Sequence, residues 1–202
     1  NTWQTRDMSD FVMGLLDVYF WTPDSGIIVG HTGPLNESSS GRILFTSDRG
    51  ATWQTRFTTS RIGEWCWKIN FPSRRVGYIS LQRNAGSPTY FLKTTDGGLT
   101  WTEKLFSSSS YYVQGIGFAT ETRGWLGGNS SQPTYGTTNG GDTWFPDTFG
   151  VRVNRFRMLS DSAGYSTGQG VYKYSRSLPT DIVEVKPAET PESFVLLNAY
   201  PN

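Results

Sequence analysis

Three seven-residue segments of this chain are near copies of one another, and they recur at an almost constant distance. They read SDRGATW at residues 47–53, TDGGLTW at residues 95–101 and TNGGDTW at residues 138–144. The closing tryptophans are therefore 48 and 43 residues apart, and Thr2-Trp3 resembles the end of one more copy. A period of about 20 to 50 residues is typical of folds that repeat one supersecondary unit.

A second marker falls between these segments and keeps the same order along the chain. It is an apolar residue followed five or six positions later by a glycine, which we call the marker glycine, and usually by an aromatic residue. Its four copies are Trp21 with Gly26, Phe71 with Gly77, Phe118 with Gly124, and Leu159 with Gly164. Two independent markers in a fixed order indicate a repeated structural unit.

Each unit divides into four short strands separated by turn residues. In the second unit the expected strands are residues 65–71, 78–82, 90–94 and 100–106. Four antiparallel strands in about 40 to 50 residues are typical of a propeller blade. The sequence therefore predicts an all-β propeller with about four blades, at residues 17–57, 65–106, 112–149 and, with three strands only, 153–175.

The two ends of this array are complementary. The chain opens with a lone outer strand at residues 2–6, and the last unit lacks that same strand. A four-bladed ring could close if the first strand completed the final blade, which would remove two open edges. The alternative, which we favour, is that the chain is a window cut from a larger ring.

Composition excludes several classes of function. The formal net charge is +1 and only 17% of the residues are charged, so we expect no nucleic-acid partner. No apolar run is long enough to span a bilayer, and we expect no membrane insertion. A single cysteine, Cys66, and a single histidine, His31, favour neither a metal site nor a cofactor.

The recurring segment has a structural explanation. Its aspartate can accept hydrogen bonds across a turn, its glycine can adopt a positive φ, and its tryptophan offers a large packing face. The third copy has asparagine in place of aspartate, which argues against catalysis or metal binding. The residues expected to build these turns are Asp48, Gly50, Trp53, Asp96, Gly98, Trp101, Asn139, Gly141 and Trp144.

These three copies resemble the Asp-box, or BNR repeat, of sialidases, sortilin-type receptors, xyloglucanase-like glycosidases and photosystem II assembly-factor-like proteins. The resemblance covers about residues 1–175. It implies a β-propeller with the boxes on the rim of one face. In these families ligands usually sit on the opposite face or in the central channel, and the shared fold does not fix the function.

The C-terminal part differs in composition. Residues 176–193 are rich in proline and acidic residues and contain no blade marker, which predicts an extended linker. Residues 194–202, FVLLNAYPN, resemble the start of the sorting domain of the type IX secretion system. That resemblance implies export across the outer membrane and a secreted or cell-surface location.

Candidate ligand-binding residues lie in loops expected on the face opposite the recurring turns, at residues 58–64, 83–89, 107–112 and 130–135. Aromatic platforms beside small polar residues suit a glycan or a protein surface. The candidates are Arg61, Trp65, Arg83, Tyr90, Tyr111, Tyr112 and Tyr135.

Three functional hypotheses follow. The first, which we favour, is an exported, non-enzymatic recognition or assembly module, with no catalytic, cofactor-binding or metal-binding residues assigned. The second is a piece of a larger propeller glycosidase or sialidase-like enzyme, which would need paired acids. The third is a homo-oligomeric array or filament built by pairing the open strands at residues 2–6 and 171–175.

Overall fold

The computed structural model describes residues 2–34, 38–128 and 132–176. These residues form fifteen β-strands and no helix. Every sheet is antiparallel and its strands pair in chain order. The predicted all-β propeller architecture is confirmed. The predicted linker and the sorting-domain-like segment lie outside the described residues, apart from Arg176 at the start of the linker.

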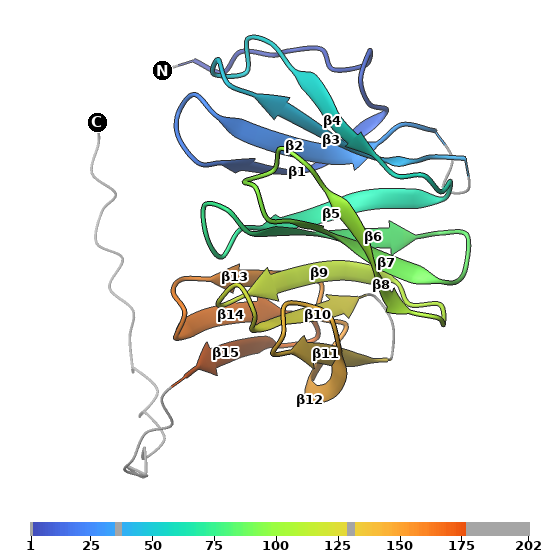
Figure 1. Ribbon diagram of the computed structural model, residues 1–202, viewed down its shortest axis with the longest axis vertical. Coiled ribbons are helices and arrows are strands. Elements are labelled where there is room, and N and C mark those ends of the chain that lie inside the picture. The colour runs from blue at the N-terminus through green and yellow to red at the C-terminus, as the bar shows by residue number, and fades with distance from the viewer. Residues whose placement is uncertain (1, 35–37, 129–131, 177–202) are drawn as a thin grey trace, which may run out of the picture.

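The strands fall into four consecutive blades (Figure 1). Blade 1 contains β1 (Gly14–Phe20), β2 (Gly26–His31), β3 (Gly41–Thr46) and β4 (Gln54–Thr58). Blade 2 contains β5 (Glu64–Asn70), β6 (Gly77–Arg83), β7 (Thr89–Thr94) and β8 (Thr102–Ser107). Blade 3 contains β9 (Val113–Phe118), β10 (Gly124–Gly128), β11 (Pro133–Thr137) and β12 (Phe145–Val151). Blade 4 contains β13 (Arg155–Met158), β14 (Ala163–Thr167) and β15 (Val171–Ser175).

The blade boundaries agree with the repeat to within a few residues, but the expected first strand is not formed. Residues 2–6 carry no strand and are exposed. The sheet of blade 4 therefore has three strands among the described residues, and the predicted closure of the ring by residues 2–6 is not present. The physical reason is local, because Met8 is buried against blade 1 and holds this segment away from an unpaired strand edge.

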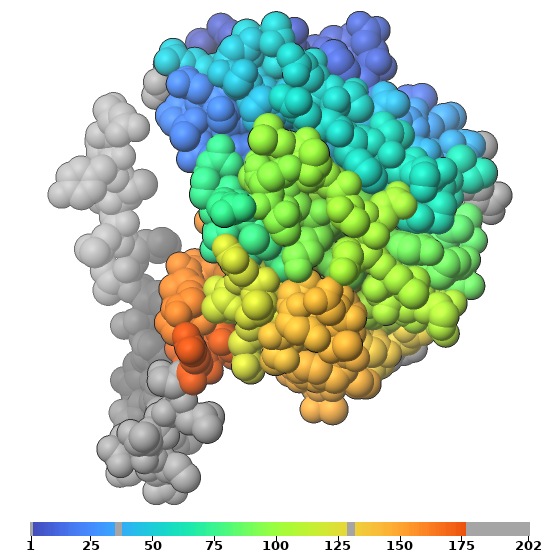
Figure 2. Space-filling view, viewed as in Figure 1, coloured from blue at the N-terminus to red at the C-terminus, as the bar shows by residue number. Residues whose placement is uncertain are grey.

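The innermost strands β1, β5, β9 and β13 follow one another around a common axis, and each contacts the next. Figure 2 shows the blades packed against one another in chain order. Because strands alternate in direction, each blade has two ends. We call the end with residues 47–53, 95–101 and 138–144 the turn face, and the end with residues 59–63, 84–88 and 108–112 the loop face.

The core lies between blades. One cluster joins Ile27, Val29 and Ile43 of blade 1 to residues of blade 2, among them Leu81 and Trp101. A second cluster joins Tyr78 and Phe91 of blade 2 to Phe118 and Leu126 of blade 3, with Trp144 packed against it. A third cluster covers the outer face of blade 1, where Met8 and Val12 pack on Ile28 and Leu44. The sheets of blades 1 to 3 thus bury their faces against neighbouring segments, whereas the strands of blade 4 remain largely exposed or half-buried.

The recurring turn is a compact hydrogen-bonded unit. In blade 2 the Thr94 hydroxyl donates to Asp96 Oδ1 at 2.8 Å and accepts from the Gly98 amide at 3.0 Å. The other side of the same carboxylate accepts from the Thr100 hydroxyl, and the Thr100 amide donates to Asp96 Oδ1 at 3.0 Å. Gly98 has a φ of 88°, which favours glycine. The Trp101 indole then donates to the Gly98 carbonyl at 3.2 Å.

The other two copies repeat this geometry. In blade 1, Asp48 accepts from the Thr46 hydroxyl and the Thr52 amide at 2.8 and 2.9 Å. In blade 3, Asn139 Oδ1 accepts the equivalent amide bond from Thr143 at 3.0 Å. Its side-chain amide donates to the Thr143 hydroxyl at 2.8 Å, where the aspartates accept instead. An uncharged side chain therefore maintains the turn.

The two aspartates should make folding sensitive to acid. Burial opposes ionisation of Asp96, but hydrogen bonds from Thr100 and Thr94 outweigh it and lower the pKa of Asp96 to about 2. Because the unfolded pKa is about 3.9, the carboxylate stabilises the fold above about pH 4, and that contribution is lost as the pH falls toward about 2. We expect Asp96→Asn to reduce the loss of stability between these pH values, measured by urea unfolding.

The matched control is the reverse change in blade 3. Asn139→Asp should add an acid-sensitive contribution, because Thr143 already donates to this position. Identical dependence of stability on pH in both variants and the parent chain would contradict a stabilising role for the ionised turn.

Candidate binding site

Two of the predicted ligand-binding residues form an ion-pair cluster at the loop face between blades 1 and 2. Glu64, fully buried at the start of β5, accepts from Arg61 Nε at 2.8 Å and from Arg83 Nη1 at 3.3 Å. Arg61 Nη1 also donates to Glu103 of β8 at 2.8 Å. The cluster ties the connection after β4 to three strands of blade 2, so the arginines are already engaged within the protein.

Two aromatic candidates pack beside this cluster. The Arg61 guanidinium lies over the Tyr90 ring, 3.7 Å from its centroid. The Trp65 ring stacks on the His31 ring of blade 1, with centroids 4.2 Å apart and planes 12° from parallel. The Trp65 indole donates to the Ser39 hydroxyl. These contacts bridge blades 1 and 2.

The other three candidates lie farther around the loop face. Tyr111 is buried, its hydroxyl donates to the Pro133 carbonyl at 2.9 Å, and its ring lies 5.7 Å from that of Tyr135. Both tyrosine rings contact Phe106 edge to face. Tyr112 alone is exposed, at 42%, and its backbone bridges to Gln82. The structure thus places the seven candidates in two separate groups, each packed within or between blades.

The Glu64 cluster gives a stability prediction. Removing one partner of a buried ion pair leaves an uncompensated charge and costs about 3 to 5 kcal/mol. We expect Glu64→Gln to lower the free energy of unfolding by about 3 kcal/mol in urea titrations. Lys104→Ala, which breaks the solvent-exposed pair with Asp142, is the control and should cost less than about 1 kcal/mol. Equal effects of the two substitutions would contradict this account.

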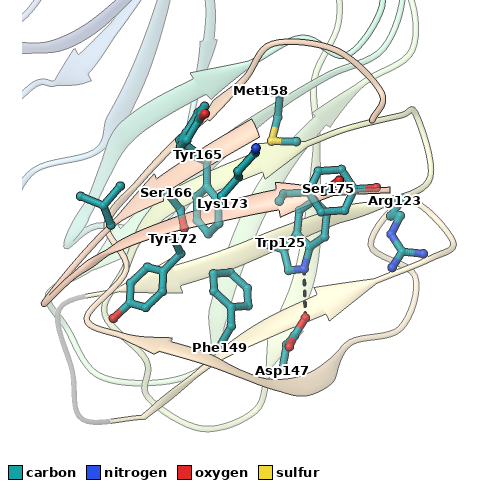
Figure 3. A pocket seen from close by; sticks show the side chains of 13 residues that line it. Arg123, Trp125, Asp147, Phe149, Met158, Tyr165, Ser166, Tyr172, Lys173 and Ser175 are labelled. Atoms are coloured by element: carbon teal, nitrogen blue, oxygen red, sulfur yellow. Dashed lines mark hydrogen bonds between the residues drawn. The ribbon is translucent and has the colours of Figure 1, made fainter. Parts of the chain in front are cut away.

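A cavity of about 570 Å³ lies between blades 3 and 4. Figure 3 shows Phe149 between Tyr172 and Trp125, with Arg123 at one end. We call this space the blade 3–4 cavity. Its lining residues are Arg123, Trp125, Asp147, Phe149, Phe156, Met158, Tyr165, Ser166, Val171, Tyr172, Lys173, Tyr174 and Ser175.

The wall of the blade 3–4 cavity is mainly aromatic. The Tyr174 ring lies 4.7 Å from the Trp125 ring, and Phe149 lies 5.8 Å from Tyr172 and 6.5 Å from Trp125. Asp147 is the one acidic residue of the lining, and its Oδ2 accepts from the Trp125 indole at 3.0 Å. Flat apolar rings with a few polar groups form a surface suited to binding rather than to proton transfer.

Among the described residues no strand pairs with the outer edge of β15, which we call the free edge of blade 4, and this edge forms one side of the cavity. All five residues of β15 line it, including neighbours whose side chains point to opposite faces of the sheet. The cavity therefore extends past the edge of the strand, into the place where blades 1 to 3 have a fourth strand. An edge strand offers unpaired backbone donors and acceptors to an added strand.

Two further cavities open at the turn face. One, of about 610 Å³, lies at the mouth of the central axis and is lined by the ends of β1, β5, β9 and β13, including Asn70 and Arg157. Asn70 accepts from the Phe118 amide at 2.9 Å and so links blades 2 and 3. The other, of about 220 Å³, lies near Arg176 and Asp161, which form an ion pair at 3.0 Å. None of the seven predicted ligand-binding residues lines any of these three cavities.

Metal binding, the reactivity of the single cysteine and the presence of membrane-spanning helices can be assessed within the described residues. They contain no group of three or more histidine, cysteine or acidic side chains placed to hold a metal ion. Burial raises the pKa of the Cys66 thiol well above its usual value, so this cysteine stays protonated. None of the described segments forms a helix long and apolar enough to cross a membrane.

The blade 3–4 cavity was not predicted from the sequence, because the candidate ligand-binding residues were placed in the loops opposite the recurring turns. The available signal was the absence of a fourth tryptophan-ended turn after β15, where Arg176 follows Ser175 instead of an aspartate. A blade without its outer strand leaves a gap against its neighbour. Trp125, Phe149 and Tyr172 face that gap, and none of them was among the predicted ligand-binding residues.

Comparison with known proteins identifies the fold. No protein-family model and no curated protein matches the sequence. A structure of YCF48 bound to D1 peptide matches with a TM-score of 0.54 and 20% identity, over 80% of this chain and 54% of that chain. YCF48 from Cyanidioschyzon merolae matches with a TM-score of 0.56 and 17% identity, over 82% of this chain and 52% of that chain.

A glycoside hydrolase also shares the fold. The GH74 enzyme of Niastella koreensis matches with a TM-score of 0.50 and 19% identity, over 76% of this chain and 27% of that enzyme. This chain therefore spans about half the length of the YCF48 structures and about a quarter of the GH74 enzyme. At these identities the likeness establishes the β-propeller fold and leaves function open.

Proposed function

We propose that this chain is a non-enzymatic recognition module that binds an extended polypeptide segment in the blade 3–4 cavity. The segment pairs its backbone with β15 and places an aromatic side chain among Trp125, Phe149 and Tyr172. The observation that carries this proposal is the position of the cavity, which joins an aromatic wall to a free strand edge. Strand addition takes affinity from main-chain hydrogen bonds and specificity from side-chain pockets.

The polar groups of the cavity favour binding over hydrolysis. Glycoside hydrolases generally need two carboxyl groups flanking the scissile bond. The lining provides one, Asp147, which is held by the Trp125 indole. Glu64 and Glu103 at the loop face are paired with arginine. For this reason we place recognition ahead of a glycosidase or sialidase-like activity.

One structure with the same fold gives the proposal a precedent. YCF48, a propeller of similar blade structure, has been solved bound to D1 peptide. A propeller of this fold can therefore hold a peptide, and we extend that principle to this chain. The turns at residues 47–53, 95–101 and 138–144, which we assign to the Asp-box class, then serve as scaffold on the turn face.

Peptide binding tests the proposal directly. We would screen the chain against a library of extended peptides with one aromatic residue each, and measure the affinity of selected peptides by calorimetry. We expect Phe149→Ala or Tyr172→Ala to weaken binding about tenfold or more, because each removes part of the aromatic wall. Leu105→Ala, at an exposed position of β8 outside the cavity, should leave binding unchanged.

Two results would contradict this function. Selective binding of a polysaccharide that is lost in Phe149→Ala would assign the cavity to glycans instead of polypeptides. Turnover of aryl glycosides or sialosides by the chain would favour the enzyme hypothesis. Circular dichroism and urea unfolding of each variant would show whether a loss of binding reflects a loss of fold.

We further propose that the protein is exported to the cell surface or the medium. The support is the sequence of residues 194–202, with its resemblance to a type IX sorting domain. In a host with that secretion system, the protein should appear in the outer-membrane or extracellular fraction. Deletion of residues 194–202 should retain it inside the cell, and unchanged export would contradict the assignment.

A further inference from the structure

One tryptophan side chain fills the gap between blades 2 and 3. Trp144 closes the recurring turn of blade 3, and its ring centroid lies 5.6 Å from Phe106 of blade 2 and 6.2 Å from Phe118 of its own blade. Trp101 of blade 2 likewise belongs to the core shared with blade 1. In each case the tryptophan lies just before the fourth strand of its blade. The fourth strand therefore positions the tryptophan side chain in the gap between the two blades.

The blade 3–4 cavity occupies the equivalent place in the next gap. Phe149 corresponds to Phe106, because each lies five residues after the tryptophan of its blade. Met158 corresponds to Phe118, because each pairs with the marker glycine of the following strand. Phe149 and Met158 both line the cavity. The cavity therefore lies where the tryptophan of a fourth strand would pack.

One segment repeats the sequence of such a strand and is paired with no strand among the described residues. Residues 2–6 read TWQTR, identical to residues 52–56, which end the recurring turn of blade 1 and enter β4. Trp53 is half-buried, whereas Trp3 is fully exposed, at 103%. All eight tryptophans lie in the described part of the chain, and Trp3 alone among them is exposed. A fully exposed tryptophan in a strand-forming sequence is suited to an interface.

We propose that residues 2–6 of a second copy of this chain add to β15 as the fourth strand of blade 4, with Trp3 in the blade 3–4 cavity. This inference rests on the proposed function and names its partner. The added strand gives blade 4 the outer strand that blades 1 to 3 have, and it covers the free edge of β15. Repeated from copy to copy, such head-to-tail pairing builds a chain of molecules, and reciprocal pairing builds a dimer.

Blade 1 supplies the register of the added strand. Gln54 lies opposite Phe45 of β3. Phe45 comes one residue before the residue of β3 that pairs with the marker glycine of β2. In β15 the residue at the same position is Lys173. Gln4 is the counterpart of Gln54, so it lies opposite Lys173 in the proposed pairing. This register is taken from the backbone pairing of β3 with β4 and of β14 with β15. It does not depend on which side chains occupy the paired positions.

A second copy fits this role better than the same molecule. Met8 is buried with Val12, Ile28 and Leu44 on blade 1, two residues after the end of the TWQTR segment. In Figure 1 the blue N-terminal segment lies with blade 1 at the top of the view, and β15 lies near the bottom. The segment of one copy can reach β15 of another while Met8 stays packed in both.

Cysteine crosslinking tests the contact and the identity of the donor. The single natural cysteine, Cys66, is fully buried and will not compete. A mixture of Gln4→Cys and Lys173→Cys chains should form a disulfide-linked heterodimer under mild oxidation. Gln4→Cys mixed with Val171→Cys is out of register by two residues and should crosslink about tenfold more slowly, because diagonal pairs are about 7–8 Å apart. Crosslinking within single molecules of the double variant would overturn pairing between copies.

A peptide of residues 1–7 tests the role of Trp3. Its affinity for a Trp3→Ala chain, whose own segment no longer competes, should fall about 30-fold when Trp3 of the peptide is replaced by alanine. The Trp3→Ala chain should also sediment as a monomer at concentrations where the parent chain associates. Its fold should be unchanged, because Trp3 makes no buried contact.

The outcomes separate this inference from the proposed function. If library peptides bind in the cavity but the peptide of residues 1–7 does not, the second-copy partner is wrong and the recognition function stands. If no peptide binds, both are wrong. A parent chain that stays monomeric at all concentrations, with no crosslinked heterodimer, also overturns the inference.

Discussion

The structure depends on one constraint: a sheet with two apolar faces cannot be stable in water until something covers both of them. Blades 1 to 3 meet it by packing on one another, and the buried side chains of β2, β6 and β10 are covered on both sides. On the outer face of blade 1, Met8 and Val12 take the place of a neighbouring blade. Packing between blades therefore decides which side chains are buried in the core and which stay exposed to solvent.

The recurring turn makes that packing repeatable. Its threonine and its aspartate or asparagine satisfy the local amides without help from neighbouring blades, so the turn has the same geometry in all three copies. A fixed turn sets where the following tryptophan enters the gap between blades. Asn139 keeps the hydrogen-bond acceptor and has no charge, so the geometry of the turn does not require an ionised side chain. The turn thus controls the position of the tryptophan that closes it, whose indole donates to the turn glycine in blades 1 and 2.

The repeat was sufficient to predict the blades because both markers report local events, a tight turn and a glycine pressed against an aromatic ring. At Gly124, for example, an added Cβ would lie 2.4 Å from the Phe118 ring. Contacts between residues distant in sequence were not predictable in the same way. Arg61 and Arg83 are predicted ligand-binding residues, and the structure adds that Glu64, distant from Arg83 in sequence, pairs with both. The blade 3–4 cavity is formed by residues of two blades, beside a strand edge that is unpaired among the described residues. Its one sequence signal is the missing tryptophan-ended turn after β15, because contacts between two blades leave no local sequence pattern.

In a complete blade, the tryptophan before the fourth strand packs into the gap between blades. A blade without that strand leaves this gap open, and we propose that the open gap selects for a partner with a similar side chain. The blade 3–4 cavity is lined by Phe149 and Met158, the counterparts of two residues that contact Trp144 in the preceding gap. In the proposed pairing, an incoming strand must therefore supply both backbone pairing and a large flat side chain. Backbone pairing alone is available to any extended chain and discriminates poorly. Filling the blade 3–4 cavity adds the burial of a tryptophan, worth about 3 to 5 kcal/mol when such a side chain is deleted from a core. Specificity at this edge therefore depends on packing more than on hydrogen bonds.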